Sequence, residues 1–350
     1  MKQRFLFVIR GKLGDTLVAF SVLRELLLRH PEYEATVIVR KNYLPLLSPA
    51  TSLSYALIPY RGRVQCWWEV FKRRWLQGPW DACVVLWGTG ENLARLAQAS
   101  GARRRLYLDD RYRNAFPEFP TRTPHVRQVD PAWRVAQLFD PALPKPEKLV
   151  LDGLAQRWRE SAAKCAIGIC PLSDEKRRNM SSDALRQLLE KLAQAHPNTP
   201  LYVLLNPGEE ALFPRDAPSS AQPRVFHTLD DLVNIYLELQ AWYGTDTGLY
   251  HLAAGMGIPC TEFFGPTQPS SNAMPAQDNR PVRLAGLGEM HCEEKSCTSA
   301  VCLNQAIRNF CGIAAPLDRD ATPAGCPLRT LDEAQLTVNT FHENPDSQAR

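Results

Sequence analysis

The sequence has no long hydrophobic run. A helix that spans a bilayer needs about 20 consecutive apolar residues, and no stretch of the 350 residues approaches that length. The apolar run at the N-terminus, Phe5 to Ile9, is too short for the hydrophobic core of a signal peptide and is closed by Arg10. We therefore expect a cytoplasmic protein.

A strong excess of charge of one sign is also missing. The formal net charge of +4 does not by itself indicate a nucleic-acid partner, and we expect none. Hydrophobic residues at 45% and charged residues at 22% are typical of an ordinary globular protein. A chain of 350 residues has room for two domains, each with its own core.

The common nucleotide-binding fingerprints are absent from the first turn. Residues Arg10–Asp15 include two glycines, but neither the third glycine of a dinucleotide fingerprint nor the Gly-Lys-Ser/Thr ending of a P-loop. The turn follows a predicted buried strand at 4–9 and precedes a predicted helix at 16–29, with the next strand at 35–39. This βαβ unit predicts a parallel sheet.

The same alternation of strands and helices continues through the second half. The proline-rich segment Pro141–Pro146 is the best linker, because prolines make a chain stiff and extended. After it the pattern predicts strands at 148–151, 166–170, 201–205 and 224–226. We expect an α/β protein with two parallel-sheet domains, residues 1–146 and 147–350, whose loops after the strands collect on one edge of each sheet.

The most distinctive stretch lies between residues 242 and 269, where a strand, a turn, a helix and a second strand follow one another. Thr245–Gly248 falls at the start of the helix, where unbonded N–H groups and the helix dipole attract phosphate. His251 lies one turn after Thr247 and so faces the same way. The alternative is that Asp246 or Thr247 simply caps the helix and that the imidazole packs beneath it.

These residues carry a resemblance. The run Gly244-Thr245-Asp246-Thr247-Gly248, followed by His251-Leu252-Ala253-Ala254 and then Phe264-Gly265-Pro266-Thr267, resembles the signature of glycosyltransferase family 9. That family comprises the ADP-heptose:lipopolysaccharide heptosyltransferases. The resemblance covers nearly the whole chain and implies a GT-B fold, in which two Rossmann-like parallel-sheet domains face each other across a cleft.

The resemblance also implies an activity. The protein would be an inverting glycosyltransferase that moves heptose from ADP-heptose onto a lipopolysaccharide inner-core acceptor, with no cofactor besides this donor and no metal. The N-terminal domain would bind the acceptor and the C-terminal domain the nucleotide sugar. Peripheral contact with the cytoplasmic face of the inner membrane is a further expectation.

Asp15 has two interpretations. The spacing alone favours a cap for the helix that follows it. In the family that the sequence resembles, the aspartate of this turn is the general base, which takes the proton from the attacking sugar hydroxyl. Arg10 and Lys12 flank the turn and suit an anionic acceptor.

The donor site implied by the resemblance draws on three loops. Arg178 stands where the family has a lysine for the diphosphate, with Lys176 as the fallback, and Glu209 matches the acid that holds the ribose. Met180 and Ser181 depart from the family's usual tryptophan and proline, and Glu209 could instead be an exposed first-turn glutamate. The predicted donor-binding residues are Ser173, Arg178, Glu209, Asp246, Thr247, Gly248 and His251.

An aromatic stripe marks the predicted helix over 64–77. Val64, Trp67, Trp68, Phe71 and Trp75 recur at helical spacing, and a basic run, residues 72–74, turns away from them. We expect the stripe to face the core of its domain. The alternative is a helix that lies on a membrane surface, with indoles at the interface and cations on lipid phosphates.

Five cysteines crowd the C-terminal part, and their spacing only half meets that of a zinc ribbon. Structural thiols are the first interpretation, a structural metal site the second, and disulfides the third in a reducing compartment. The five are Cys292, Cys297, Cys302, Cys311 and Cys326.

Two rival functions stay open on the sequence. One is a relative that transfers heptose to a protein hydroxyl, against which the basic loops argue mildly. The other is a sugar-nucleotide-binding protein without catalysis, in which Asp15 is only a cap. A variant that replaces Asp15 separates the second rival from the enzyme, since it should keep donor binding and lose transfer.

Overall fold

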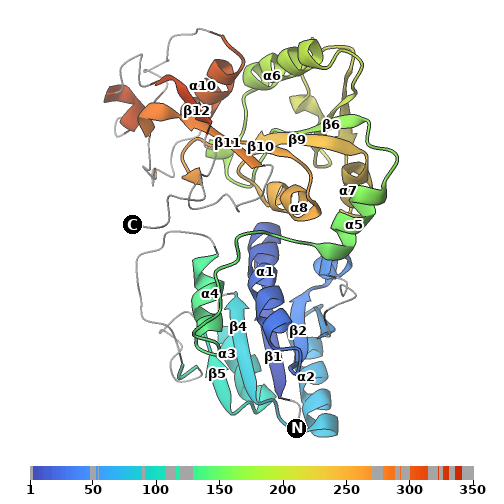
Figure 1. Cartoon of the computed structure of the whole chain (residues 1–350), viewed down its shortest axis with the longest axis vertical. Helices are drawn as coiled ribbons and strands as arrows, with labels where there is room; N and C mark the ends of the chain where they lie inside the picture. Colours follow the sequence, from blue (N-terminus) through green and yellow to red (C-terminus); the bar gives the residue numbers. More distant parts are fainter. Residues whose placement is uncertain are drawn as a thin grey trace. The chain divides into compact units, whose positions relative to one another are not determined.

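The computed structural model shows an α/β protein with two parallel sheets, as predicted (Figure 1). It describes residues 3–47, 53, 55–88, 91–107, 116–118, 129–269, 279–287, 292, 300–313, 322, 326–330 and 336–340. The chain divides into two compact units, Met1–Ala155 and Gln156–Arg350.

The first unit is built on a parallel sheet in the order β3-β2-β1-β4-β5. The order reverses beside β1, so the carboxyl end of β1 lies at the switch point where open α/β sheets bind ligands. β1 can occupy this central place because its residues from Phe5 to Ile9 are apolar and buried on both faces. The strands are β1 (Arg4–Ile9), β2 (Glu34–Arg40), β3 (Tyr55–Tyr60), β4 (Ala82–Trp87) and β5 (Arg104–Leu106).

Two pairs of helices cover this sheet. α1 (Leu13–Arg29) packs beside α4 (Asp130–Gln137), and α2 (Arg63–Gln77) packs beside α3 (Glu91–Ser100). Alternate residues of β1, Leu6 and Val8, join the core beneath α2 and α3. Because side chains alternate across a strand, the other pair covers the opposite face. A short 3-10 helix, η1 (Lys41–Leu47), follows β2.

The second unit holds a larger sheet in the order β12-β11-β10-β9-β6-β7-β8, parallel except for β12. β9 lies between β10 and β6, so the loops that follow these three strands are neighbours at one edge. The strands are β6 (Ala166–Cys170), β7 (Leu201–Leu205), β8 (Ala221–Val225), β9 (Leu239–Thr245), β10 (Cys260–Phe263), β11 (Asn279–Leu284) and β12 (Val338–Thr340).

The helices around this sheet are short, and several loops contain a single 3-10 turn. α5 (Asp152–Glu160) spans the division between the two units. The other helices are α6 (Ser182–Ala195), α7 (Leu229–Leu237), α8 (Gly248–Met256) and α10 (Val301–Phe310), and the turns are η3 (Lys176–Arg178), η4 (Glu210–Leu212), η5 (Ala285–Leu287) and η6 (Pro327–Thr330).

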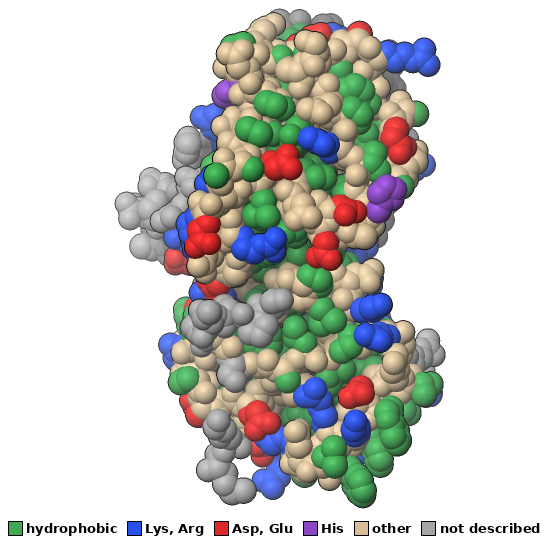
Figure 2. Space-filling model, turned by 90° about the vertical axis from the view of Figure 1, so that its right-hand side faces the viewer, with side chains coloured by type: hydrophobic (Ala, Val, Ile, Leu, Met, Phe, Trp, Pro, Cys, Tyr) green, Lys and Arg blue, Asp and Glu red, His purple; other side chains and the backbone are tan. Residues whose placement is uncertain are grey.

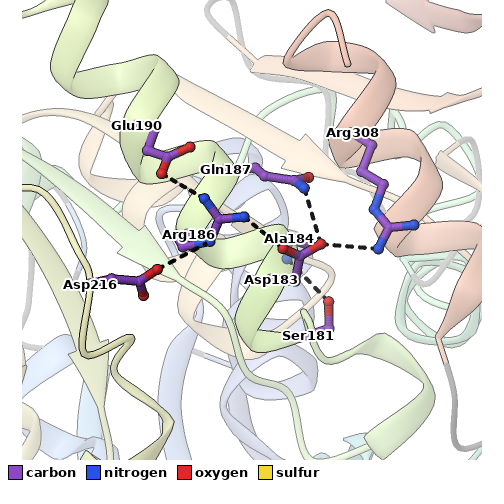
Figure 3. Close-up of polar contacts among 8 residues, drawn as sticks. All are labelled: Ser181, Asp183, Ala184, Arg186, Gln187, Glu190, Asp216 and Arg308. Carbon is purple, nitrogen blue, oxygen red and sulfur yellow. Dashed lines mark hydrogen bonds and ion pairs between the residues drawn. The ribbon is translucent and has the colours of Figure 1, made fainter. Parts of the chain in front are cut away.

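The N-terminus of α6 is capped by the protein's own side chains (Figure 3). The Ser181 hydroxyl accepts the Ala184 N–H at 3.1 Å. The Asp183 carboxylate accepts from Arg186 at 2.8 Å and from Arg308 of α10 at 3.1 Å. The Arg186 hydrogen bond, followed by that of Arg308, holds the pKa of Asp183 below its usual value. This helix start therefore has a side-chain cap and an acid that is already paired with two arginines.

Two predictions about local structure are wrong. Residues 148–151 form no strand, although Leu149 and Leu151 are buried. The aromatic stripe of α2 does not face the core, because Cys66 and Val70 occupy the inward side of the helix. Among the helices that the structure describes, none is both long and apolar enough to cross a membrane.

Candidate functional site

Three loops meet at the carboxyl edge of the second sheet. Asp246 follows β9, Thr267 follows β10, and Arg178 comes from the loop after β6. The Thr267 hydroxyl donates to Asp246 Oδ2 at 2.7 Å, and Arg178 Nη1 lies 3.1 Å from the same oxygen. Asp246 is buried, so a single carboxylate oxygen ties together the three loops that parallel-strand topology predicts to converge.

The N-terminus of α8 begins directly beside this cluster and, unlike that of α6, has no side-chain cap. Thr247 is the N-cap residue, with φ −151° and ψ 160°, and its hydroxyl makes no capping hydrogen bond. The Tyr250 N–H bonds to the Thr247 carbonyl at 3.1 Å. Within the described part of the chain, no acceptor takes the N–H groups of Gly248 and Leu249. Such a helix start binds anions.

A carboxylate next to an anion site needs compensation, and Asp246 has it. The Arg178 guanidinium brings a positive charge to it, and the Thr267 hydroxyl brings a neutral donor. Arg178 also bonds to Glu175 Oε1 at 2.9 Å through Nη2, so both of its terminal nitrogens have partners. The residue predicted to bind the diphosphate is therefore held by two acids, Asp246 and Glu175, beside the start of α8.

The neighbouring Arg177 has a structural role. Its side chain is buried, and its Nη1 donates to the Cys292 carbonyl at 2.7 Å. The Cys292 N–H in turn donates to the Pro266 carbonyl at 2.9 Å. The loop after β6 thus braces the turn after β10 through the first of the C-terminal cysteines.

Glu262 is a site residue that the sequence analysis missed. It lies in β10 opposite Gly244 of β9, is fully buried, and neither carboxyl oxygen has a hydrogen-bond partner within the described residues. Burial raises the pKa of Glu262 well above its usual value, the charge of Asp246 raises it further, and Arg178 opposes both. The signal was an acid in a short strand, residues 260–263, that is buried throughout.

His251 is buried in the first turns of α8, and its ring lies 5.1 Å from that of Tyr250 between centroids. The structure places the predicted donor residues Arg178, Asp246, Thr247, Gly248 and His251 in the loop after β6 and at the start of α8, two neighbouring positions at one sheet edge.

The other two predicted donor residues lie to one side of this cluster. The Ser173 N–H donates to Asn179 Oδ1 at 2.7 Å, which shapes the loop after β6. Glu209 Oε2 accepts the Asn206 backbone N–H at 2.9 Å and its side-chain amide at 2.8 Å, which shapes the turn after β7. β7 is two strands from β9, a separation of roughly 10 Å.

In the first unit, Asp15 occupies the third position of α1. Its Oδ2 accepts the Lys12 backbone N–H at 3.2 Å, so it does cap the helix, from within it. A Cβ at Gly11 would lie 2.4 Å from the Cβ of Asp15 and 2.7 Å from Trp87, so only glycine fits there. The Arg10 guanidinium stacks on the Tyr60 ring at 3.9 Å, and Lys12 is exposed.

No group of three or more His, Cys, Asp or Glu side chains within the described residues is placed to hold a metal ion. Cys302 and Cys326 pack against a small apolar cluster around Leu284, and burial raises the pKa of Cys311 to about 11. The described cysteines form no disulfide with one another, and Cys297 lies outside the described residues.

Two Rossmann-like parallel sheets, the second with a helix start at its carboxyl edge that has no side-chain cap, are the architecture of the GT-B class. The sequence profile of glycosyltransferase family 9 (heptosyltransferase) matches residues 135–302. The chain thus contains a domain of glycosyltransferase family 9, and the protein is a glycosyltransferase. The family resemblance drawn from the sequence is confirmed.

Solved structures share the fold. Escherichia coli ADP-heptose lipopolysaccharide heptosyltransferase II superposes with a TM-score of 0.65 at 17% identity, over 88% of this chain and 98% of that one. The family 9 glycosyltransferase of Veillonella parvula gives 0.64 at 15%, over 80% and 86%. E. coli heptosyltransferase WaaC with ADP gives 0.64 at 16%, over 83% and 96%. No curated protein sequence matches the chain.

Proposed function

We propose that the protein transfers heptose from ADP-heptose to a sugar hydroxyl of the lipopolysaccharide inner core, with inversion at the anomeric carbon. The observation that carries this proposal is the helix start of α8, whose Gly248 and Leu249 N–H groups take no acceptor in the described chain. It lies within the segment that matches the family, residues 135–302. Structural relatives with ADP and with an ADP-heptose analogue support a nucleotide-sugar donor.

In this proposal the diphosphate of the donor binds at the start of α8. The Gly248 and Leu249 N–H groups and the Thr247 hydroxyl supply hydrogen bonds, and the helix dipole supplies positive potential. Arg178 adds a full positive charge and donors that can bind phosphate oxygens. These groups stabilise the negative charge that develops on ADP as it leaves. His251 and Ser173 complete the donor side.

The acids of the second unit are assigned to hydroxyl groups rather than to phosphate. Asp246, already paired with Arg178 and Thr267, would accept from a heptose hydroxyl. Glu209 would accept from the ribose, since a glutamate side chain on the loop two strands from β9, roughly 10 Å away, can reach toward a sugar attached to the α-phosphate.

Asp15 is assigned as the general base. The acceptor oxygen forms a bond to the anomeric carbon, its proton passes to the Asp15 carboxylate, and the bond from the anomeric carbon to the phosphate oxygen breaks to release ADP. The Lys12 N–H, bonded to Oδ2, orients the carboxylate. Arg10 and Lys12 are assigned to acidic groups of the acceptor, and the setting we propose is the cytoplasmic face of the inner membrane.

The direct test is to incubate the purified protein with ADP-heptose and a panel of truncated lipopolysaccharides, and to measure ADP release and the acceptor mass. We expect one truncation to gain a single heptose with stoichiometric ADP. Donor binding without transfer to any of these acceptors, together with labelling of a surface-protein acceptor, would overturn the lipopolysaccharide assignment.

A further inference from the structure

The outward face of α2 is strongly apolar. Val64, Trp68, Phe71 and Trp75 are 84, 62, 51 and 80% exposed. At 100° per residue they fall within about 60° of one another around the helix axis. Trp68 and Phe71 stack with ring centroids 6.1 Å apart. A contiguous exposed aromatic stripe of this kind marks an interaction surface in a soluble protein.

The inward face of α2 explains why the stripe points outward. Cys66 and Val70 are buried in the core beneath α2 and α3, on the side of the helix opposite the stripe. These small and medium side chains let the helix lie close to the sheet. Among the described residues of the first unit, the large aromatic side chains therefore lie outside the core, and a partner would explain their exposure.

Cations flank the stripe on both sides. Lys72 and Arg74 lie about 80° from its centre in opposite directions, and both are exposed. Arg74 Nη1 donates to the Ala99 carbonyl at 3.1 Å, which holds the guanidinium beside the stripe. Residues 63–77 contain four basic residues and one acid, Glu69, a net charge of +3 against +4 for the whole chain. Figure 2 views the first unit from the side of α2, where hydrophobic side chains lie beside Lys and Arg.

We propose that α2 docks the first unit onto an anionic lipid surface. Trp68, Phe71 and Trp75 would enter the boundary between headgroups and acyl chains, where indole rings are favoured, and Lys72 and Arg74 would bind lipid phosphates. A second copy of the chain fits this surface poorly, because pairing the stripes would bring the flanking cations of the two copies together. A lipid surface of opposite charge is complementary to both parts of the pattern.

The surface lies in the unit that carries Asp15. α2 begins where β3 ends, at the carboxyl edge of the first sheet, and Asp15 follows β1 at the same edge. Docking would bring this edge to a lipid-borne acceptor. The purpose of the surface rests on the proposed function, but its affinity for lipid does not.

The test is co-sedimentation of the full chain with vesicles of phosphatidylcholine containing phosphatidylglycerol, with no acceptor or donor present. We expect wild type to bind these vesicles, to bind vesicles of phosphatidylcholine alone at least tenfold more weakly, and to be released by salt. The double variant Trp68→Gln/Trp75→Gln should bind at least tenfold more weakly than wild type. Lys72→Gln should lose severalfold in affinity.

Leu28→Gln is the matched control, because Leu28 is an exposed apolar residue, 43% accessible, on α1 of the same unit. It should bind as wild type does. The double variant should keep the wild-type melting temperature and its transfer rate to a lipid-free oligosaccharide acceptor, which separates this proposal from the proposed function. Equal vesicle binding by wild type and the double variant would overturn the proposal. The proposal would also be overturned if wild type bound no vesicles and instead formed a dimer in solution that the double variant does not form.

Discussion

The same strand–turn–helix unit occurs at the carboxyl edge of both sheets, but the two copies place their acid differently. In the first unit Asp15 lies inside α1 and accepts the N–H of Lys12, the residue at the helix start. In the second unit Asp246 lies outside α8, buried and held by Arg178 and Thr267.

The placement of the acid decides what the helix start can do. An acid inside the first turn occupies a helix N–H and presents a carboxylate, which suits a group that takes up a proton. An acid outside the turn, neutralised by an arginine, leaves the N–H groups for an anion. One backbone arrangement thus provides a candidate base in one unit and a candidate diphosphate site in the other.

The largest effect is expected from Asp15→Asn. If this acid is the base, the transfer rate should fall by about 10²- to 10⁴-fold, the range for loss of a general base, while the Kd for the donor stays unchanged. Steady-state rates and donor titration on the same preparation measure both. Glu25→Gln, on the same helix, is the control and should keep the wild-type rate. An undiminished transfer rate in Asp15→Asn would show that Asp15 acts only as a helix cap.

Arg178→Gln should weaken donor binding by about 10- to 100-fold, because it removes a charge-assisted hydrogen bond to phosphate. Lys176→Gln, in the same turn and exposed, should change the Kd by less than about threefold. Calorimetric titration with ADP compares the two. A larger loss of ADP affinity in Lys176→Gln would show that Lys176, rather than Arg178, contacts the phosphate. Asp246 would then not be linked to the bound anion through Arg178.

Glu262→Gln should change stability in a pH-dependent way. The raised pKa of Glu262 means that the folded protein keeps this proton while the unfolded chain loses it, so wild-type stability falls as pH rises above the unfolded value. Glutamine does not ionise, so the stability of the Glu262→Gln variant does not fall with pH for this reason. Its free energy of unfolding should equal that of wild type near pH 4 and exceed it at pH 8 by roughly 1–3 kcal/mol. Urea unfolding at the two pH values measures this, and a variant less stable at pH 8 would contradict a neutral Glu262.

The smallest effect is expected at the capped helix start of α6. Asp183→Asn should lower the free energy of unfolding by about 0.5–1 kcal/mol, the range for exposed ion pairs. The lowered pKa of Asp183 means that its contribution is present at neutral pH and is lost as pH falls through the folded value. Donor affinity should not change. A loss of donor binding would show that α6 and α8 are not as different as their caps indicate.

The main elements of both sheets could be predicted from the sequence because parallel strands buried on both faces are short apolar runs, as in β1 and β6. Residues 148–151 show where this fails, since an extended segment with two buried leucines has the pattern of a strand but no pairing partner. Pairing is a long-range property that local pattern does not contain.

The prediction that the aromatic stripe of α2 faces the core was wrong for a related reason. The helix carries two stripes of apolar side chains, the large aromatic one and a smaller one. The more apolar stripe faces the core only where the space between the helix and the sheet can hold its side chains. Here the space takes Cys66 and Val70. The candidate site, too, has a part that the sequence predicts and a part that it does not. The glycine and threonine turn after β9 could be predicted from turn chemistry, whereas the role of Glu262 depends on a desolvated position that only the packed sheet defines.

The central claim is that the start of α8 binds the diphosphate of the donor, and a crystal structure of the protein with ADP tests it most directly. We expect phosphate oxygens within hydrogen-bond distance of the Gly248 and Leu249 N–H groups and of the Arg178 guanidinium, with the ribose toward Glu209. A diphosphate bound away from α8, with those N–H groups facing water or protein, would contradict it.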